Sequence, residues 1–374
     1  MTEVAQSRQA ARASLPASGL LEVDKPRGVT SHDIVAAARA VLHTKHVGHA
    51  GTLDPMATGL LIVGFGSATR LLSYIVGDDK TYETTIRLGQ GTTTDDADGD
   101  PLPRSSEETT AVAEAIRRLS DEDIHKAADC LTGDLRQVPS AFSAKKIHGQ
   151  KAYDLARNGD VVKLEAQPVT VYSFEILGIR RTMADAAGTT PGGALRDQPV
   201  IDVDARITCS SGTYIRALGR DMGAALGTGA HLVRLRRTRV GSFDVTDPDV
   251  VAAHAQDHTF VNRQGETVTH PWAVFDEPET LGAHAMSPAD GARRAMPTMR
   301  ISAQQADDLR HGRFIEGIVH GPTAAIVSAD GCDDEHRGDG IHGDGTGGEA
   351  SAADTLVAIV ERRTKRLLKP SVVF

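Results

Sequence analysis

Strict alternation of apolar and polar residues in two distant segments limits the fold of this chain more than any other feature. In KTYETTIRLG, residues 80–89, Tyr82 shares one set of alternate positions with Ile86 and Leu88. In VIDVDARITC, residues 200–209, every second residue from 201 to 209 is apolar. A period of two is that of a β-strand, so both segments predict strands, and Tyr82 shares the apolar face of the first.

Segments with helical spacing alternate with these and other strand-like segments. Residues 20–24 and 60–63 predict strands, and the helix between them begins at Thr30 or Ser31, either of which can cap its first turn. Ser67 is expected to cap a second helix that runs through Ile75. Further helices are expected near 111–119, 121–131, 148–159 and 215–226, and a further strand in VTVYSFEIL, residues 169–177. This order predicts a mixed chain of helices and strands.

The length of 374 residues and the 40% hydrophobic content allow two domains with a sizeable core. The longest apolar runs are far shorter than the roughly 20 residues of a membrane-spanning helix, so no membrane partner is expected. Residues 1–18 lack the apolar middle of a secretory signal and are expected to form a disordered tail. Three cysteines without a C-x-x-C pair predict neither a disulfide framework nor a zinc site, and they favour a cytoplasmic location.

The net charge of −9 is concentrated in one segment. Residues 328–354 contain eight acids, one base and many glycines, which predicts a flexible acidic insert. A basic cluster lies elsewhere, in HLVRLRRTRV. Its residues Arg234, Arg236 and Arg237 are candidates for contacts with nucleic-acid phosphates, although a solvated strand or helix face has the same composition.

Three segments come close to known ligand-binding motifs, and each departs from its motif. GFGSAT has Thr69 where a dinucleotide-binding turn has its third glycine, which weakens the hypothesis of a nucleotide-dependent oxidoreductase. CSSGTYIR places six residues rather than five between Cys209 and Arg216, one more than a cysteine-phosphatase loop has. DDADGDP has Pro101 where a calcium loop requires glycine. We therefore expect neither a metal nor an organic cofactor.

A single carboxylate, Asp54, lies in the glycine-rich stretch GHAGTLDPMATGLL. Glycines let the backbone adopt positive φ and approach a ligand closely, which suits a nucleophile or base. An ordinary Asp-Pro turn explains the same residues, and composition alone favours that interpretation.

Five segments, taken together, favour a functional role for Asp54 over an ordinary turn. They are GLLEVDKPRGVTSHD, GHAGTLDPMATGLLIVGFGSATR, KTYETTIRLGQGTTTDDADGD, QVPSAFSAKKIHGQKAYDLARNG and CSSGTYIRALGRDMG, in this order. The set strongly resembles the bacterial tRNA pseudouridine-55 synthases, the TruB family, over about residues 19–245. The resemblance implies an α+β fold with a mixed, mainly antiparallel sheet and flanking helices.

The family resemblance also implies a domain division. Residues 19–270 would form the catalytic domain and 271–298 a linker. Residues 299–374 resemble, more weakly, the small β-rich PUA-like domain of the family, which the acidic insert 328–354 interrupts. The implied activity is the conversion of a T-loop uridine of tRNA to pseudouridine, without a cofactor, on a nucleotide turned out of the RNA.

The resemblance assigns three catalytic residues. Asp54 corresponds to the catalytic aspartate, Tyr82 to the active-site tyrosine and Arg216 to the arginine that pairs with the aspartate. Their chemistry agrees, because a carboxylate can attack a sugar carbon, a guanidinium holds it charged, and an aromatic ring can stack on uracil. Attack at C1′, abstraction of a ribose proton to give a glycal, and addition at C6 of the base all remain open.

Further residues are assigned around these three. Leu235 corresponds to a pocket leucine, and Asp96 to an acid that contacts the extruded region or Arg216. Lys25, with the proline that follows it, would support the active-site loop. His49 would fill the space that the extruded nucleotide leaves, or would only bond within its loop. Arg234, Arg236 and Arg237 would contact RNA phosphates.

The expected partner is the T-arm of tRNA, with no protein partner and a monomeric state. A module that binds or folds tRNA without catalysis is the alternative, but such a module would not need Asp54, Tyr82 and Arg216 together.

Overall fold

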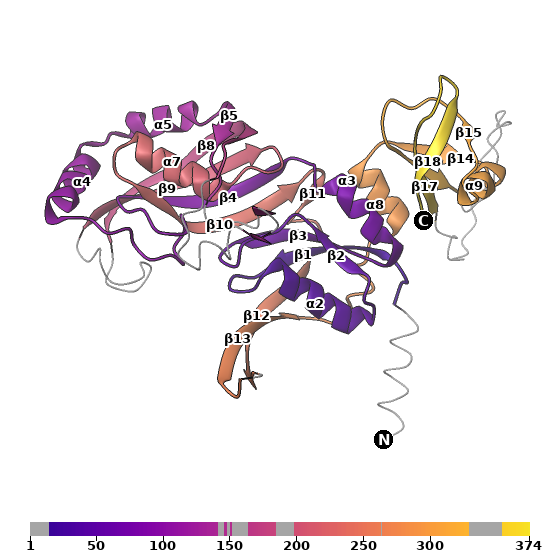
Figure 1. Ribbon diagram of the computed structural model, residues 1–374, viewed down its shortest axis with the longest axis horizontal. Coiled ribbons are helices and arrows are strands. Elements are labelled where there is room, and N and C mark those ends of the chain that lie inside the picture. Colours follow the sequence, from indigo (N-terminus) through magenta and orange to yellow (C-terminus); the bar gives the residue numbers. More distant parts are fainter. Residues whose placement is uncertain are drawn as a thin grey trace, which may run out of the picture.

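The computed structural model describes residues 15–140, 146–147, 150–151, 164–184, 198–262, 264–328 and 354–374. The molecule is elongated, with a large sheet and its helices on one side and a small C-terminal unit on the other (Figure 1). No helix in these ranges is long and apolar enough to span a bilayer.

The large sheet has the strand order β13-β12-β1-β3-β10-β4-β9-β8-β5, with β2 paired to β3 and β11 to β10. Among its described strands only β1 with β12 and β3 with β10 are parallel neighbours, so the sheet is mainly antiparallel, as predicted. Its strands are β1 (Gly19–Lys25), β2 (Val47–Ala50), β3 (Thr58–Phe65), β4 (Lys80–Leu88), β5 (Gly133–Gln137), β8 (Gln167–Met183), β9 (Pro199–Cys209), β10 (Ala230–Val240), β11 (Phe243–Asp244), β12 (Val251–Val261) and β13 (Thr267–Phe275).

The helices of this part are α2 (Ser31–Leu42), a 3-10 turn η1 (Gly66–Leu71) continued by α3 (Leu72–Ile75), α4 (Ser106–Arg118), α5 (Asp121–Cys130) and α7 (Ile215–Ala225). Thr30 caps α2 in a capping box with Asp33, as the sequence predicts. The prediction for Ser67 was wrong. The 3-10 turn already begins at Gly66 without a side-chain cap, and the Ser67 hydroxyl lies 2.9 Å from that of Ser18. The helix expected over 148–159 falls largely outside the described residues.

The C-terminal unit is a separate five-stranded sheet of order β14-β16-β17-β18-β15 with one helix, α9. Its elements are β14 (Thr298–Ile301), α9 (Ala303–Arg310), β15 (Ile315–Glu316), β16 (Thr323–Val327), β17 (Thr355–Arg362) and β18 (Leu367–Val373). The unit is β-rich, as expected. Residues 329–353 of the predicted acidic insert lie outside the described residues.

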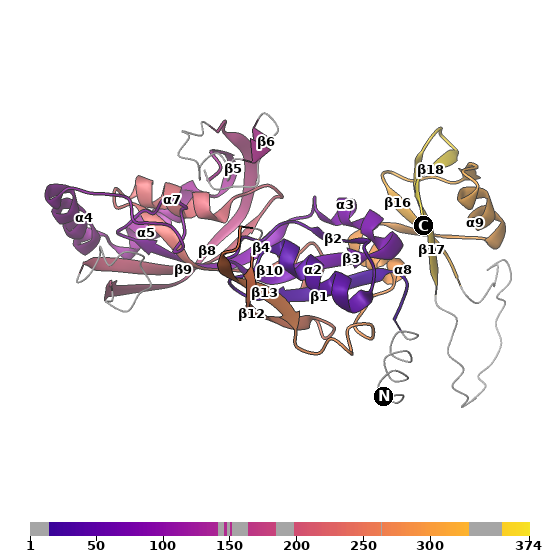
Figure 2. The same ribbon diagram turned by 60° about the horizontal axis from the view of Figure 1, so that its bottom comes forward.

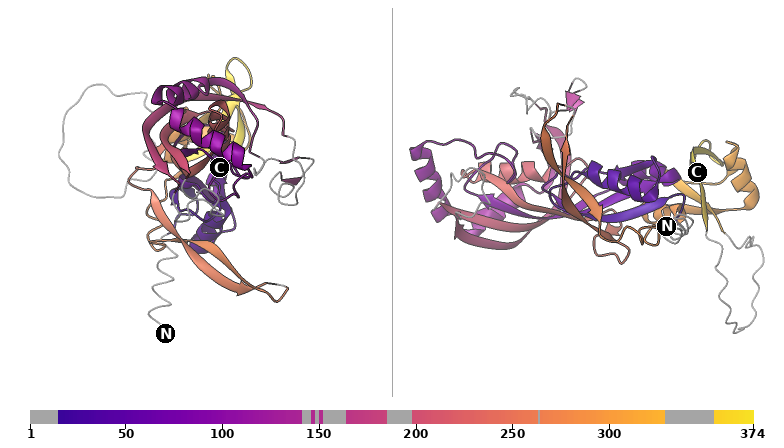
Figure 3. Two further views of the ribbon diagram at one scale, coloured as in Figure 1. Left: turned by 90° about the vertical axis from the view of Figure 1, so that its left-hand side faces the viewer. Right: turned by 90° about the horizontal axis from the view of Figure 1, so that it is seen from below.

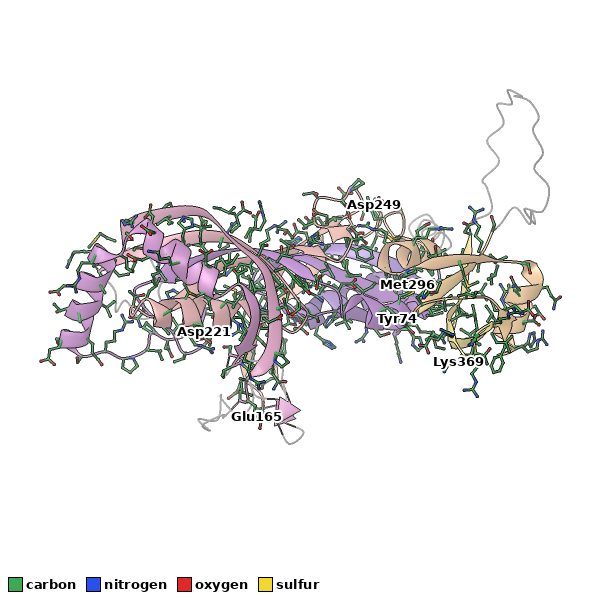
Figure 4. The ribbon with its side chains drawn as sticks, turned by 90° about the horizontal axis from the view of Figure 1, so that it is seen from above. Tyr74, Glu165, Asp221, Asp249, Met296 and Lys369 are labelled. Atoms are coloured by element: carbon green, nitrogen blue, oxygen red, sulfur yellow. The ribbon has the colours of Figure 1, made fainter. Side chains whose placement is uncertain are left out.

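The segment predicted as a linker, 271–298, contains regular structure. The boundary at residue 270 falls inside β13, and helix α8 (Pro288–Ala295) lies between the two sheets. One apolar cluster runs from β1 and β3 through α8 to β16 and β17. Figure 4 labels Tyr74 and Met296 at this junction, where both side chains pack on that cluster. The C-terminal unit is therefore joined to the large sheet through a shared core.

The centre of the large sheet carries the polar residues of interest. Strands β4 and β10 lie between α2 and α7 in Figures 1 and 2. The β2–β3 connection and the first residues of α7 both lie near these strands. Residues that are far apart in the sequence, such as Asp54 and Arg216, therefore lie close together there.

Candidate active site

A cavity of about 260 Å³ opens at the centre of the large sheet. Its walls come from the β2–β3 connection, the start of β4, the loop between β9 and α7, and strand β10. Among the residues that line it are Asp54, Tyr82, Arg216, Leu235 and Arg237.

The loop that carries Asp54 is held by backbone and side-chain hydrogen bonds. The Asp54 carbonyl accepts a 3.1 Å hydrogen bond from the Ala57 amide, so the Asp-Pro turn exists. Ser31, at the start of α2, accepts from the Leu53 amide at 2.8 Å and donates to its carbonyl at 3.2 Å. Gly51 takes φ +90°, which favours glycine. The turn therefore presents the carboxylate, whose side chain is 37% exposed and lines the cavity.

Arg216 connects Asp54 to a second acid. Its Nε lies 3.0 Å from Asp54 Oδ2, and its Nη1 lies 3.3 Å from Asp96 Oδ2. Nη1 also donates to the Thr94 carbonyl at 2.8 Å. The Arg216 side chain is only 5% exposed, so it brings a desolvated, well-anchored positive charge to a carboxylate that faces the cavity.

Asp96 is buried, and burial raises the pKa of its carboxyl above the usual value. Its Oδ1 accepts hydrogen bonds from the Thr94 hydroxyl and from the Asp98 amide. Of the two alternatives for this acid, the structure places it against Arg216.

Tyr82 and Leu235 form apolar walls of the cavity, and both are nearly buried. Leu235 is opposite Thr84 in the β4–β10 ladder, and Arg237 is opposite Tyr82, so these side chains share one face of the sheet. Burial raises the pKa of Tyr82 above its usual value of 10, which keeps the hydroxyl protonated at neutral pH.

Two buried cations, Lys25 and Arg237, stabilise the backbone around the cavity through hydrogen bonds to carbonyl groups. Lys25 is fully buried and donates to the carbonyls of Val29 and Pro26 at 2.7 and 2.9 Å. Burial lowers its pKa to about 8. Arg237 is 1% exposed and donates to the carbonyls of Leu60 and Gly51 at 2.8 and 3.1 Å. Arg237 also lines the cavity, and these two bonds occupy only part of its guanidinium, so its predicted phosphate contact stays a prediction.

Arg234 and Arg236 lie on the other face of the sheet. Arg236 is opposite Glu83 in the ladder and pairs with Asp24 through two contacts of 2.9 and 2.7 Å. Arg234 lies 4.0 Å from Glu83. Successive side chains of a strand point to opposite faces, so Leu235 enters the cavity while its two arginine neighbours face away. The Arg234 side chain is 54% exposed, so phosphate contacts of these arginines stay a prediction, on the face of the sheet away from the cavity.

His49 lies half-buried on β2, and its Nδ1 is buried without a hydrogen-bond partner among the described residues. Burial lowers the pKa of its imidazole, so the ring is neutral at physiological pH. A backbone hydrogen bond at Gly51 acts in the opposite direction on this pKa, so a hydrogen bond within the loop and a role in extrusion both stay predictions for His49.

Sequence reasoning missed three residues around the cavity. Lys80 and Tyr214 line it, and burial lowers the pKa of Lys80 to about 8. Gln137, at the end of β5, is 3% exposed and binds both backbone groups of Tyr214, at 2.8 Å from the amide and 3.0 Å from the carbonyl. Gln137 opens the quoted segment QVPSAFSAKKIHGQKAYDLARNG, but the sequence does not indicate its role, since its partner is 77 residues away.

Comparison with known proteins identifies the family. Residues 39–215 match the N-terminal domain of the TruB family of pseudouridylate synthases, and 216–268 match the C-terminal domain of tRNA pseudouridylate synthase B. The tRNA pseudouridine synthase B of Bifidobacterium longum (strain DJO10A) is 48% identical over 356 residues, covering 83% of this chain and 92% of the relative. That of Thermobifida fusca (strain YX) is 43% identical over 315 residues, covering 84% and 92%.

Solved structures agree on the fold. A chain of an H/ACA ribonucleoprotein bound to a substrate RNA containing 2′-deoxyuridine superposes with a TM-score of 0.57 at 20% identity, covering 98% of this chain and 87% of that one. A chain of the archaeal box H/ACA Nop10–Cbf5 complex gives 0.55 at 20% identity, covering 96% and 86%. With relatives this similar over most of its length, the chain belongs to the TruB family of pseudouridylate synthases.

Proposed function

We propose that this protein converts a uridine in the T-loop of tRNA, at position 55, to pseudouridine, and that Asp54 acts as the nucleophile. The observation that carries the proposal is the Arg216–Asp54 pair at 3.0 Å, in which a buried guanidinium holds a carboxylate at the wall of a cavity. The relatives named tRNA pseudouridine synthase B supply the substrate class.

The reaction is an isomerisation, so no co-reactant is needed. The N1–C1′ bond of the uridine breaks, the uracil turns, C5 bonds to C1′, and the proton on C5 is lost while N1 gains one. Asp54 acts ionised in each possible route, whether it attacks C1′, removes a ribose proton or adds to C6. Arg216 compensates the negative charge of the carboxylate and fixes its direction.

The cavity walls supply the other requirements. The ring of Tyr82 provides a face on which uracil can stack, and Leu235 excludes water while the base turns. The Tyr82 hydroxyl is protonated at neutral pH and is therefore a poor base, so we assign this side chain to stacking on uracil rather than to removal of the C5 proton.

The uridine must leave the RNA stack to reach Asp54, at a cost of about a few kcal/mol. His49, neutral and with an unpartnered buried nitrogen, is our candidate for the side chain that fills the vacated space. Action on the T-arm as a monomer in the cytoplasm stays a prediction from the sequence.

The test is to incubate an unmodified tRNA transcript with the wild type and with Asp54→Asn, and to map pseudouridine. We expect one modified T-loop position with the wild type and none with Asp54→Asn, while RNA binding is largely kept. Asp249→Asn is a matched control, since Asp249, labelled in Figure 4, is exposed and is not among the residues that line the cavity. Full turnover by Asp54→Asn would refute the nucleophile, and binding without modification by the wild type would favour the non-catalytic module.

A further inference from the structure

The ribbon of strands β12 and β13 projects from the edge of the large sheet. Only Val251 and Ala252 of β12 pair with β1, so residues 253–261 pair with β13 alone. Nine residues at about 3.3 Å each extend roughly 30 Å. Figure 3 shows the ribbon standing out on the side of the sheet that α2 covers.

One face of the outer ribbon is aromatic. The cross-strand pairs Gln256–Trp272, His258–His270 and Phe260–Val268 place these side chains on the same face. We call this set, Gln256, His258, Phe260, Val268, His270 and Trp272, the ribbon face. The rings of His258 and Trp272 are stacked, with centroids 3.9 Å apart and planes 7° apart.

The ribbon face is not part of the core. The side chains of Trp272 and Phe260 remain 48% and 40% exposed. The opposite face supplies the anchor, because Ala273 and Phe275 pack with the residues of α2. An isolated two-stranded ribbon is marginally stable in water, so large exposed aromatic rings on it indicate a contact surface.

The position of the ribbon connects it to the cavity. Helix α2 holds Leu53, next to Asp54, through Ser31 at its first turn, and the same helix packs on the base of β13. The ribbon therefore rises from the same side of the sheet as the catalytic loop, where a bound RNA would extend beyond the nucleotide in the cavity.

The chemistry of the ribbon face fits RNA. Asp257 pairs opposite Pro271 and so points to the other face. Glu266, at the tip, accepts a 2.9 Å hydrogen bond from Asn262, so none of the six residues of the ribbon face itself is a carboxylate. Flat exposed rings stack on unpaired bases, and imidazole N–H groups donate to phosphate or base oxygens.

We propose that the ribbon face binds the RNA substrate outside the cavity, with the His258–Trp272 stack as a platform for an unpaired base. This inference rests on the proposed function, because the RNA it contacts is the one whose uridine enters the cavity. The ribbon is a substrate-positioning surface and takes no part in the chemistry.

The chain has a single tryptophan, so Trp272 reports directly on this contact. We expect the intrinsic fluorescence of the full chain, in the Asp54→Asn form, to be quenched in a saturable way by an unmodified tRNA transcript. Trp272→Ala has no tryptophan left, so its Kd is measured by filter binding. The substitution should raise the Kd about thirtyfold, the middle of the range for loss of one stacking ring, while the single-turnover rate at saturating RNA stays unchanged.

Two variants control for folding of the ribbon. Trp272→Phe keeps a stacking ring and should restore most of the affinity. Thr269→Ala changes the opposite face, where Thr269 contacts Thr259, and should bind as the wild type does. A wild-type Kd for Trp272→Ala, in a protein that still modifies tRNA, would overturn the ribbon contact and leave the proposed function intact.

Two other results would each overturn one of the two proposals. If Trp272→Ala dissociates a dimer seen by sedimentation, the ribbon face binds a second copy of the chain and the RNA contact is wrong. If the wild type modifies no tRNA, the proposed function itself fails, whatever the fluorescence shows.

Discussion

Gln137 gives a sharp test of how the fold prepares the active site. Its amide group receives the Tyr214 N–H and donates to the Tyr214 carbonyl, and Arg216 follows two residues later. Gln137→Leu keeps the approximate volume but removes both hydrogen bonds. The Tyr214 N–H loses its partner, while the Tyr214 carbonyl still accepts from the Leu218 amide at 3.2 Å. A buried unpaired backbone group costs about 1–3 kcal/mol. Because Tyr214 is half-buried and water can reach part of it, we take about 1–2 kcal/mol for the pair.

The lost hydrogen bonds destabilise the loop that positions Arg216, so we expect a slower chemical step. Since 1.36 kcal/mol corresponds to tenfold, the single-turnover rate at saturating tRNA should drop about 5- to 30-fold, with the RNA Kd unchanged. Gln137→Glu keeps the acceptor for the Tyr214 N–H but loses the donor, and should have a smaller effect. The thermal midpoint of both variants should fall by only a few degrees.

Two outcomes would refute this reasoning. A lower thermal midpoint with an unchanged rate would make Gln137 a structural residue that does not position Arg216. Equal rates for the Leu and Glu variants would mean that the hydrogen bond from the Tyr214 N–H contributes nothing.

Three further predictions follow from the same structure. Arg216→Ala should lose most of the single-turnover rate with a modest loss of RNA affinity, and a large loss of affinity alone would make it a phosphate contact instead. Arg363→Glu with Arg366→Glu, in the exposed basic turn after β17, should weaken tRNA binding and reduce the salt dependence by about one per residue, as measured by titration in salt. Burial raises the pKa of Glu22 from 4.5 to about 8, so unfolding should become easier as pH rises from about 4.5 to 8, and Glu22→Gln should abolish that dependence in thermal melts.

The elements that the sequence predicted share a visible local signal. The strand over residues 80–88 alternates because one face packs in the apolar core and the other carries polar side chains, such as Arg87 in its pair with Asp202. Helix α2 carries its capping box within four residues. The ribbon of β12 and β13 had no such signal. Both faces of its outer part meet solvent, so burial does not impose a period of two on its residues.

The residues of the active site also differ in whether the local sequence could predict them. The position of Asp54 in a glycine-rich turn was visible in the sequence, but its partners were not, because Arg216 and Gln137 come from elements more than 80 residues away. Only the family resemblance supplied Arg216. Gln137 acts through backbone groups, which no motif of side chains records.

The arginines of β10 show why a cluster in the sequence is a poor guide to a surface. Arg234, Arg236 and Arg237 are close along the chain, yet the strand sends the first two to one face and the third to the other. On the cavity face, the buried Arg237 donates hydrogen bonds to the carbonyls of Leu60 and Gly51 and so stabilises the catalytic loop. On the far face, Asp24 pairs with Arg236, while Arg234 lies 4.0 Å from Glu83 and its side chain stays 54% exposed. Phosphate contacts at these two residues therefore stay a prediction, and the salt titration of the β17 turn and the fluorescence experiment on the ribbon face address two other surfaces.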